Sequence, residues 1–145
     1  GETEADHQAT MDLVCQVNFA SCYSFKYSPR PGTPAAVMGG IVPEAVKNAR
    51  LQELQTLIFD QSRDYNQRSV GTVQPVLFDR KGSKDGQLLG KTPYMQSVYA
   101  VAPERLFGQI VDVSINAATQ NGLAGTIVTT ETNSSPNPNQ KREAA

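Results

Sequence analysis

Hydrophobic residues in the first part of the chain follow two periods, one helical and one typical of strands. From Ala9 to Val17 they recur every four positions, which predicts a helix over about residues 3–17 that opens with a capping box. From Phe19 to Tyr27 bulky and small residues alternate, which predicts a strand. A helix followed by a strand that has no partner strand of its own indicates half of a βα repeat.

A proline-rich loop follows the predicted strand. In YSPRPGTPAA, residues 27–36, each proline fixes its own φ and keeps the preceding residue out of the α region, so the backbone around Arg30 is expected to be stiff and extended. From Pro43 to about Arg68 apolar residues recur at spacings of three and four, which predicts one long amphipathic helix. This helix would connect the N-terminal region to the rest of the chain.

Short β segments separated by Gly, Pro, Asp and Asn dominate the chain from Val70 onwards. Five of them predict a small antiparallel barrel over residues 69–131, with Pro75 at an edge or a bulge and Gly108 at the bend that closes the barrel. The segments are VQPVLFDR, QLLGKT, QSVYAVA, FGQIVDVSIN and GLAGTIVT. Residues 132–145 are polar, contain prolines and lack a hydrophobic period, so we expect a disordered tail there.

The charge balance and the cysteines narrow the possible partners. The 145 residues include 13 Lys and Arg against 14 Asp and Glu, a net charge of −1, so any RNA contact must come from a local basic patch. Cys15 and Cys22 fit neither a disulfide framework nor a metal site, and we expect buried thiols in a reducing compartment. His7 is expected to be solvated. No segment resembles a signal peptide or a membrane span, which indicates a cytoplasmic protein without a membrane or DNA partner.

Basic residues and one aromatic residue gather in two turns of the predicted barrel. Small five-stranded barrels bind unpaired nucleic acid through cationic loops and aromatic platforms, because phosphates attract cations and bases stack on π faces. The alternative is a hairpin that carries solvated charge and binds nothing. The candidate RNA-binding residues are Arg80, Lys81, Lys84, Lys91 and Tyr94.

Arg30 is the candidate for anion recognition. Ligands of βα barrels bind at the C-terminal ends of the strands, where Arg30 would follow the predicted strand. A guanidinium held there can bind a carboxylate or a phosphate through two hydrogen bonds. The alternative is a surface arginine in a turn. The sequence shows no paired catalytic carboxylates, no nucleophile with its base and no phosphate-binding loop, so it is not expected to be a complete enzyme.

Seven stretches of the sequence resemble one family. GETEADHQATMDLV, SFKYSPRPGTPAA and VPEAVKNARLQELQ resemble the last βα elements of the TIM-like radical S-adenosylmethionine barrel in the methylthiotransferases. GTVQPVLFDR, GKTPYMQSV, LFGQIVDVSI and NGLAGTIV resemble the OB-like TRAM domain that follows this barrel. The resemblance implies a barrel piece over residues 1–40, a connecting helix over residues 41–68 and an RNA-binding TRAM domain over residues 69–131. The arginine within Y-S-x-R-x-G-T favours the members that modify tRNA.

The resemblance also implies a chemistry. The family uses two [4Fe–4S] clusters and S-adenosylmethionine, and its tRNA members add a 2-methylthio group to N(6)-isopentenyladenosine beside the anticodon. The cluster motif C-x-x-x-C-x-x-C is absent here, so this chain is expected to correspond to the C-terminal part of the family, to bind no cluster and to be inactive by itself. The TRAM domain would hold the tRNA anticodon stem-loop. The residues implied at the rim of the complete barrel, near cofactor and substrate, are Tyr27, Ser28, Arg30, Gly32 and Thr33.

Two other functions fit the same residues. In a methylthiotransferase that modifies a ribosomal protein, the barrel would dock a polypeptide loop in place of RNA. In a stand-alone RNA-binding module, the first seventy residues would only support the TRAM domain. The family interpretation expects residues 1–40 to be loosely packed or mutually associated, because a lone strand leaves its edges unpaired. A stand-alone module instead predicts that all 145 residues form one stable, cooperative protein.

Overall fold

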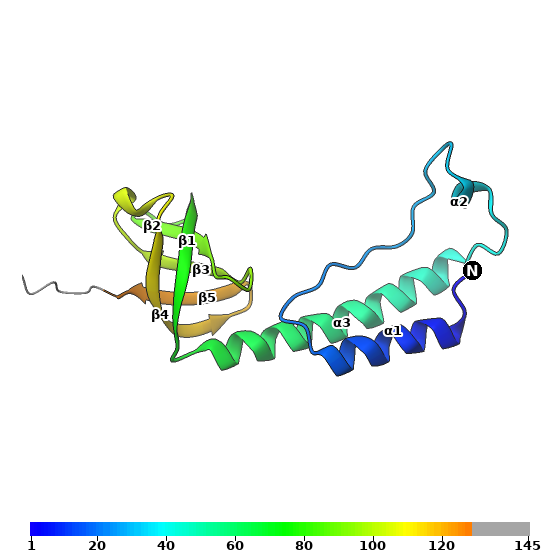
Figure 1. Ribbon diagram of the computed structural model, residues 1–145, viewed down its shortest axis with the longest axis horizontal. Helices are drawn as coiled ribbons and strands as arrows, with labels where there is room; N and C mark the ends of the chain where they lie inside the picture. The colour runs from blue at the N-terminus through cyan, green and yellow to red at the C-terminus, as the bar shows by residue number, and fades with distance from the viewer. Residues whose placement is uncertain (129–145) are drawn as a thin grey trace, which may run out of the picture.

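The computed structural model describes residues 1–128, which form a helical region and a β barrel joined by one long helix (Figure 1). The barrel follows directly after the long helix α3. The elements in chain order are α1 (Glu4–Val17), α2 (Pro34–Val37), α3 (Glu44–Ser69), β1 (Val73–Lys81), β2 (Gln87–Lys91), β3 (Ser97–Val101), the 3₁₀ helix η1 (Glu104–Leu106), β4 (Ile110–Thr119) and β5 (Gly122–Ile127). The predicted tail, residues 132–145, lies outside the described residues.

Helix α1 begins at the predicted capping box and ends at Val17, as the hydrophobic period predicts. Thr3 and Asp6 form a capping box: the Asp6 amide donates to Thr3 Oγ1 at 3.2 Å and the Thr3 amide donates to Asp6 Oδ2 at 2.8 Å. The hydrogen bonds from Thr3 lower the pKa of Asp6. At the other end Asn18 adopts the left-handed conformation (φ 56°), and its amide donates to Val14 O at 3.0 Å.

Helix α1 packs alongside α3 with the two helices running in the same direction (Figure 1), so that residues 2, 7 and 14 contact residues 50, 53 and 61 in turn. Val14 and Ile58 are the buried hydrophobic residues of this contact, and polar groups complete it. Gln61 Nε2 donates to Val14 O at 2.9 Å. His7 is only 4% exposed, with Nε2 2.9 Å from Glu53 Oε2. The expectation of a solvated His7 was wrong, because α3 covers that face of α1.

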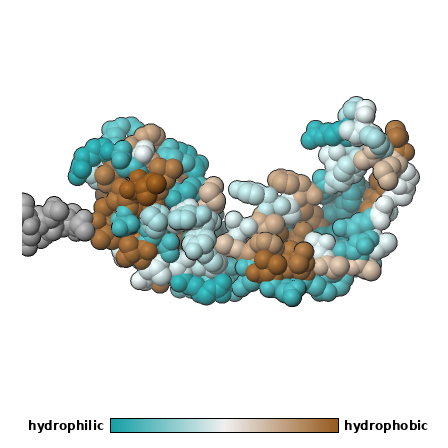
Figure 2. Space-filling view, viewed as in Figure 1, coloured by the Kyte–Doolittle hydropathy of each residue, from teal (hydrophilic) through white to brown (hydrophobic). Residues whose placement is uncertain are grey.

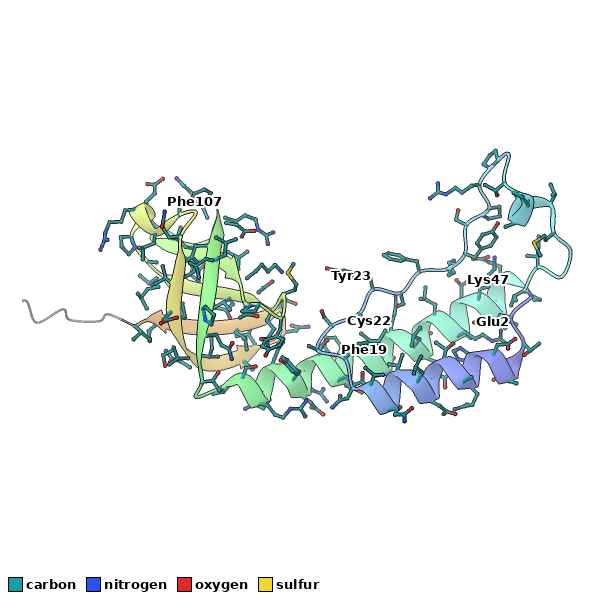
Figure 3. All side chains as sticks on the ribbon, in the orientation of Figure 1. Glu2, Phe19, Cys22, Tyr23, Lys47 and Phe107 are labelled. Carbon is teal, nitrogen blue, oxygen red and sulfur yellow. The ribbon has the colours of Figure 1, made fainter. Side chains whose placement is uncertain are left out.

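The predicted strand after α1 is absent: residues 18–33 form an irregular, mostly extended segment that runs over α3 (Figure 1). Alternating side chains become a strand only when a neighbour supplies ladder hydrogen bonds, and no residue of the described range 1–128 pairs with this segment. Tyr23 and Phe25 are 87% and 83% exposed. Figure 2 shows hydrophobic surface on the helical region, and Figure 3 labels Tyr23 on the side of the segment away from α1.

The five predicted strands are present and close into a barrel in the order β1-β2-β3-β5-β4. Four of the five pairings are antiparallel, but β3 and β5 run parallel, with Val98 opposite Leu123. The prediction of an antiparallel barrel was therefore wrong at this one seam. The parallel pairing joins strands that are not neighbours in the sequence, and it removes the last free edge of the sheet.

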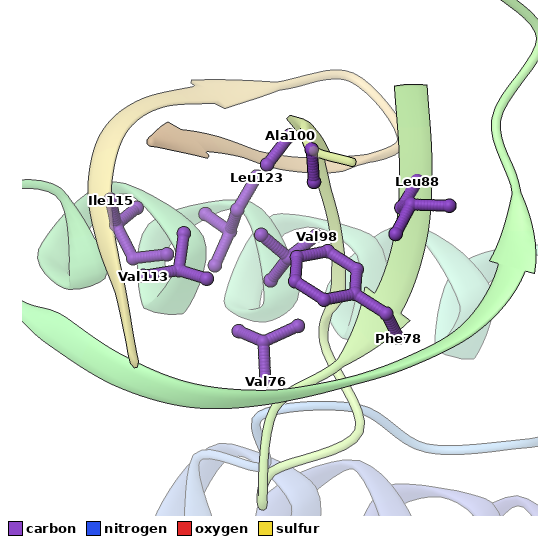
Figure 4. Packing of buried hydrophobic residues seen from close by; sticks show 9 residues of the cluster. Val76, Phe78, Leu88, Val98, Ala100, Val113, Ile115 and Leu123 are labelled. Atoms are coloured by element: carbon purple, nitrogen blue, oxygen red, sulfur yellow. The ribbon is translucent and has the colours of Figure 1, made fainter. Parts of the chain in front are cut away.

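The barrel core is filled by inward side chains from all five strands (Figure 4). Along β1, Val76 and Phe78 are fully buried, whereas Leu77 between them is exposed. Pro75 pairs with β4 only, because pairing with β2 starts at Leu77, so it occupies the predicted edge position. Gly108 precedes β4 with φ 76°, as the predicted bend requires. The largest fully buried side chains are Phe78, Ile115, Leu123, Val76, Val98 and Val113.

Candidate nucleic-acid interface

The β1–β2 hairpin carries three of the predicted RNA-binding residues and is called the basic hairpin below: Arg80 and Lys81 are the last residues of β1, and Lys84 lies in the turn. The Gly82 amide donates to Gln87 O at 2.7 Å, which closes the hairpin on itself. Arg80, Lys81 and Lys84 are all exposed. A shallow depression of about 370 Å³ lies between this turn and Glu104 at the start of η1.

Two of these three cations are paired with carboxylates. Lys81 Nζ lies 2.6 Å from Glu104 Oε1, and this pair raises the pKa of Lys81 and lowers that of Glu104. Arg80 Nε lies 3.4 Å from Asp79 Oδ1. Lys84 takes part in no ion pair among residues 1–128. Since an exposed ion pair contributes little stability, Lys81 exchanges Glu104 for another anion at small cost.

Lys91 and Tyr94 lie at the other end of β2, in and beside the turn that leads to β3. The Lys91 ammonium donates to Ser97 Oγ at 2.8 Å and to Met95 O at 3.3 Å. Strand β2 has five residues, so about 16 Å separates this turn from the basic hairpin. The structure therefore divides the five predicted RNA-binding residues into two surfaces.

In the β2–β3 turn the predicted residue Tyr94 meets α3 beside Tyr65 and Arg68, two residues that the sequence analysis did not select. The rings of Tyr65 and Tyr94 have centroids 5.7 Å apart and an interplanar angle of 67°. The Arg68 guanidinium carbon lies 5.9 Å from the Tyr65 ring centroid. Burial and then the neighbouring Tyr94 raise the pKa of Tyr65, whereas Arg68 opposes this shift. The three-residue spacing of Tyr65 and Arg68 on a helix was the available signal.

The proline-rich loop forms a tight turn around Arg30. The Thr33 amide and hydroxyl both donate to Arg30 O, at 3.2 Å and 2.8 Å, and Gly32 has a φ of 81° that favours glycine. Ser28 and the Arg30 side chain are exposed, and Arg30 makes no ion pair within residues 1–128. The turn therefore presents the guanidinium to solvent.

Tyr27 lines a cavity of about 420 Å³ between the proline-rich loop, the N-terminus and α3. Arg50 also lines this cavity: its guanidinium lies 2.8 Å from Glu2 Oε2 and 2.9 Å from Glu4 Oε2, while its buried Nε has no hydrogen-bond partner within residues 1–128. Figure 3 places Glu2 near this end of α3. The other four predicted rim residues, Ser28, Arg30, Gly32 and Thr33, are not in its lining.

The described residues do not provide a metal site. No group of three or more His, Cys, Asp or Glu side chains occurs within residues 1–128. Cys15 and Cys22 are both exposed free thiols, so the expectation of buried thiols was wrong; neither side chain is covered by another element. A [4Fe–4S] cluster is held by four thiolates, and this chain has two cysteines.

The barrel is a TRAM domain. Residues 67–128 match the family model described as "TRAM domain", and this range contains all five strands and the last turn of α3. None of the helices within residues 1–128 combines the length and the apolar character that crossing a bilayer requires.

Similarity to curated proteins extends beyond the barrel to 88% of the chain. The chain is 52% identical over 127 residues to the "tRNA-2-methylthio-N(6)-dimethylallyladenosine synthase" of Maricaulis maris (strain MCS10). Proteins of the same name from Rickettsia felis and Rickettsia prowazekii (strain Madrid E) are 50% and 51% identical to it over 129 residues. The predicted resemblance to the methylthiotransferases is confirmed, and the chain is related to one part of them. It spans 28–29% of the length of these relatives.

Proposed function

We propose that this chain serves a tRNA methylthiotransferase as its tRNA-binding part. The TRAM barrel holds the anticodon stem-loop, while the rest of the enzyme adds a 2-methylthio group to N(6)-isopentenyladenosine beside the anticodon in the cytoplasm. The observation that carries this proposal is the 50–52% identity, over 88% of the chain, to proteins named for that reaction.

The family chemistry requires two [4Fe–4S] clusters and S-adenosylmethionine, which supply the radical and the sulfur. The two exposed cysteines of this chain do not fit a cluster. We therefore assign cofactor binding to the remainder of the enzyme and no reaction step to the residues described here. Their contribution is to bind and orient the RNA.

The proline-rich loop is the part of this chain that we place beside the reaction. Its turn holds Arg30 without an anionic partner among the described residues, which suits a side chain that receives an anionic group from substrate or cofactor. Tyr27, Ser28, Gly32 and Thr33 complete this rim.

The basic hairpin provides the first contact with the RNA backbone. Lys84 has no carboxylate partner within residues 1–128, and Arg80 and Lys81 are exposed beside it. The hairpin therefore gathers three exposed cations close together in the sequence. A phosphate contact is sequence-independent and depends on salt, so this surface supplies affinity and not base recognition.

Replacing Lys84 tests this assignment. Binding of the full chain to an isopentenylated anticodon stem-loop is measured by fluorescence anisotropy at several salt concentrations. We expect Lys84→Gln to weaken binding and to reduce the slope of log K against log salt by about 1. Arg63→Gln, which removes one exposed positive charge from α3, is the matched control and is expected to leave the slope unchanged. Equal slopes for Lys84→Gln and the unmodified chain would reject the hairpin as a phosphate contact.

A further inference from the structure

The β2–β3 turn is fixed against α3 by buried polar contacts. Gln96 is 7% exposed, and its Nε2 donates to Asn66 Oδ1 at 2.7 Å and to Ser69 Oγ at 3.1 Å on α3. Within the turn, Thr92 Oγ1 accepts from the amides of Tyr94 and Gln96 at 3.2 Å and 3.3 Å. The turn is therefore preorganised before any ligand arrives.

This rigid turn exposes two large side chains. Tyr94 is 54% exposed and Met95 is 64% exposed. Met95 has a φ of 63°, a left-handed conformation that is unfavourable for a residue with a side chain, and the Lys91 ammonium donates to its carbonyl oxygen at 3.3 Å. Strain of this kind persists where the surrounding structure enforces it and gathers at ligand sites.

Cationic and aromatic groups of α3 stand beside the exposed ring. Tyr65 meets Tyr94 edge to face, which fixes the orientation of the Tyr94 ring. Arg68, one helical turn from Tyr65, lies 5.9 Å from the Tyr65 centroid and is exposed. An exposed aromatic ring followed in the chain by an exposed thioether, with a guanidinium on the aromatic residue that it contacts, suits a nucleobase joined to its phosphate.

We propose that Tyr94 and Met95 form a stacking site for one unpaired RNA base, with Arg68 contacting the adjoining phosphate. The proposal rests on the proposed function and deepens it, because it assigns base contact to the junction of α3 and the β2–β3 turn and phosphate contact to the hairpin about 16 Å away. Lys91 is a positioning residue in this arrangement, since its ammonium braces the carbonyl of Met95. A polypeptide ligand would not require the combination of stacked ring and cation.

The test compares variants of the full chain binding to an anticodon stem-loop and to a fully paired RNA duplex of the same length. Tyr94→Leu removes the π face and keeps an apolar side chain. It is expected to weaken stem-loop binding by about 5- to 150-fold, the range measured for loss of one stacked base, without changing the salt slope. Duplex binding is expected to stay the same. Tyr94→Phe, which keeps the ring, is expected to retain affinity.

Phe107→Leu is the matched control, since Phe107 is a 48%-exposed aromatic residue at the end of the barrel away from α3 (Figure 3). It is expected to bind like the unmodified chain, and unchanged circular dichroism is expected for all variants. Salt-sensitive stem-loop binding that survives Tyr94→Leu would overturn the stacking site and leave the proposed function intact. A Phe107→Leu loss equal to that of Tyr94→Leu would also overturn this location. Absence of stem-loop binding by the unmodified chain would reject both proposals.

Discussion

The barrel and the helical region are stabilised by different kinds of contact. In the barrel, a single cluster of apolar side chains is sealed from solvent by a closed sheet. In residues 1–69, only Val14 and Ile58 are buried hydrophobic residues, and most of the remaining links between segments are polar. Those links include the contacts of His7 with Glu53, Arg50 with Glu2 and Glu4, Gln61 with Val14, Ser62 with Ala20, and Lys26 with Glu44 and Asn48.

We expect this difference to make the barrel the more stable region and the helical region the one that responds to pH and salt. Apolar burial stabilises the barrel without depending on pH or salt, so its surface can present charged and aromatic groups at fixed positions. The helical region leaves Tyr23 and Phe25 exposed, and its polar contacts respond to pH and ionic strength. We expect the barrel to remain folded under conditions that loosen the helical region.

The largest loss of unfolding free energy is expected from a cavity in the barrel core. Phe78 is fully buried, and Phe78→Ala should reduce the free energy of unfolding of the barrel by about 3–5 kcal/mol. Amide hydrogen exchange of residues 73–127 in increasing urea measures this loss. Val101→Ala, at an 80%-exposed position of β3, is expected to change it by less than about 0.5 kcal/mol. Similar losses for the two variants would contradict a barrel that depends on its closed core.

An intermediate loss of unfolding free energy, confined to the helical region, is expected for His7→Ala. The substitution removes the hydrogen bond to Glu53 and leaves a gap between α1 and α3, which should cost about 1–3 kcal/mol. Hydrogen exchange should accelerate in residues 4–17 and stay unchanged in the barrel. Gln8→Ala, at the exposed next position, serves as the control. Accelerated exchange in the barrel would show that the two regions unfold together.

The smallest effect on the stability of the helical region is expected from protonation of Glu44 at low pH. Hydrogen bonds from Lys26 and then Lys47 lower the pKa of Glu44 from 4.5 to about 2. Because the folded pKa is the lower one, the stabilisation by this carboxylate is complete above pH 4.5 and is lost as the pH falls towards 2. Nuclear magnetic resonance titration should show the ion pair of Lys26 with Glu44 lost in that window, while the 2.7 Å hydrogen bond from Lys26 Nζ to Asn48 Oδ1 remains; Glu44→Gln should abolish this pH dependence. Loss of the ion pair near pH 4.5 would contradict these contacts.

Local signals in the sequence predicted the helices and strands better than the contacts between them. The capping box, the long helix and all five barrel segments depend on neighbouring residues, and the structure contains them. The strand over Phe19 to Tyr27 failed because its alternation lacked a pairing partner. The buried His7 and the parallel β3–β5 seam depend on contacts between residues far apart in the sequence, which periodicity does not encode.

The candidate site shows the same limit. The basic residues of the hairpin were found because Arg80, Lys81 and Lys84 are close in the sequence. The grouping of Tyr94 with Tyr65 and Arg68 was missed, since it arises only when the β2–β3 turn packs on α3. Its only sequence signals were an aromatic residue in a turn and a three-residue spacing on a distant helix.

The uninterrupted helix α3 holds the helical region and the barrel at a fixed distance along its axis. Its 26 residues span about 39 Å. Directly after the helix the chain is tied to β4, because the Gly71 amide donates to Ile115 O at 2.8 Å and the Ile115 amide donates to Thr72 O at 2.9 Å. The number of residues in the helix therefore fixes both the distance and the rotation between the helical region and the barrel. One residue inserted near its middle would move the barrel about 1.5 Å along the axis and rotate the proposed stacking ring about 100° around it. The position and the orientation of the proposed RNA-binding surface are therefore set by the same count of residues.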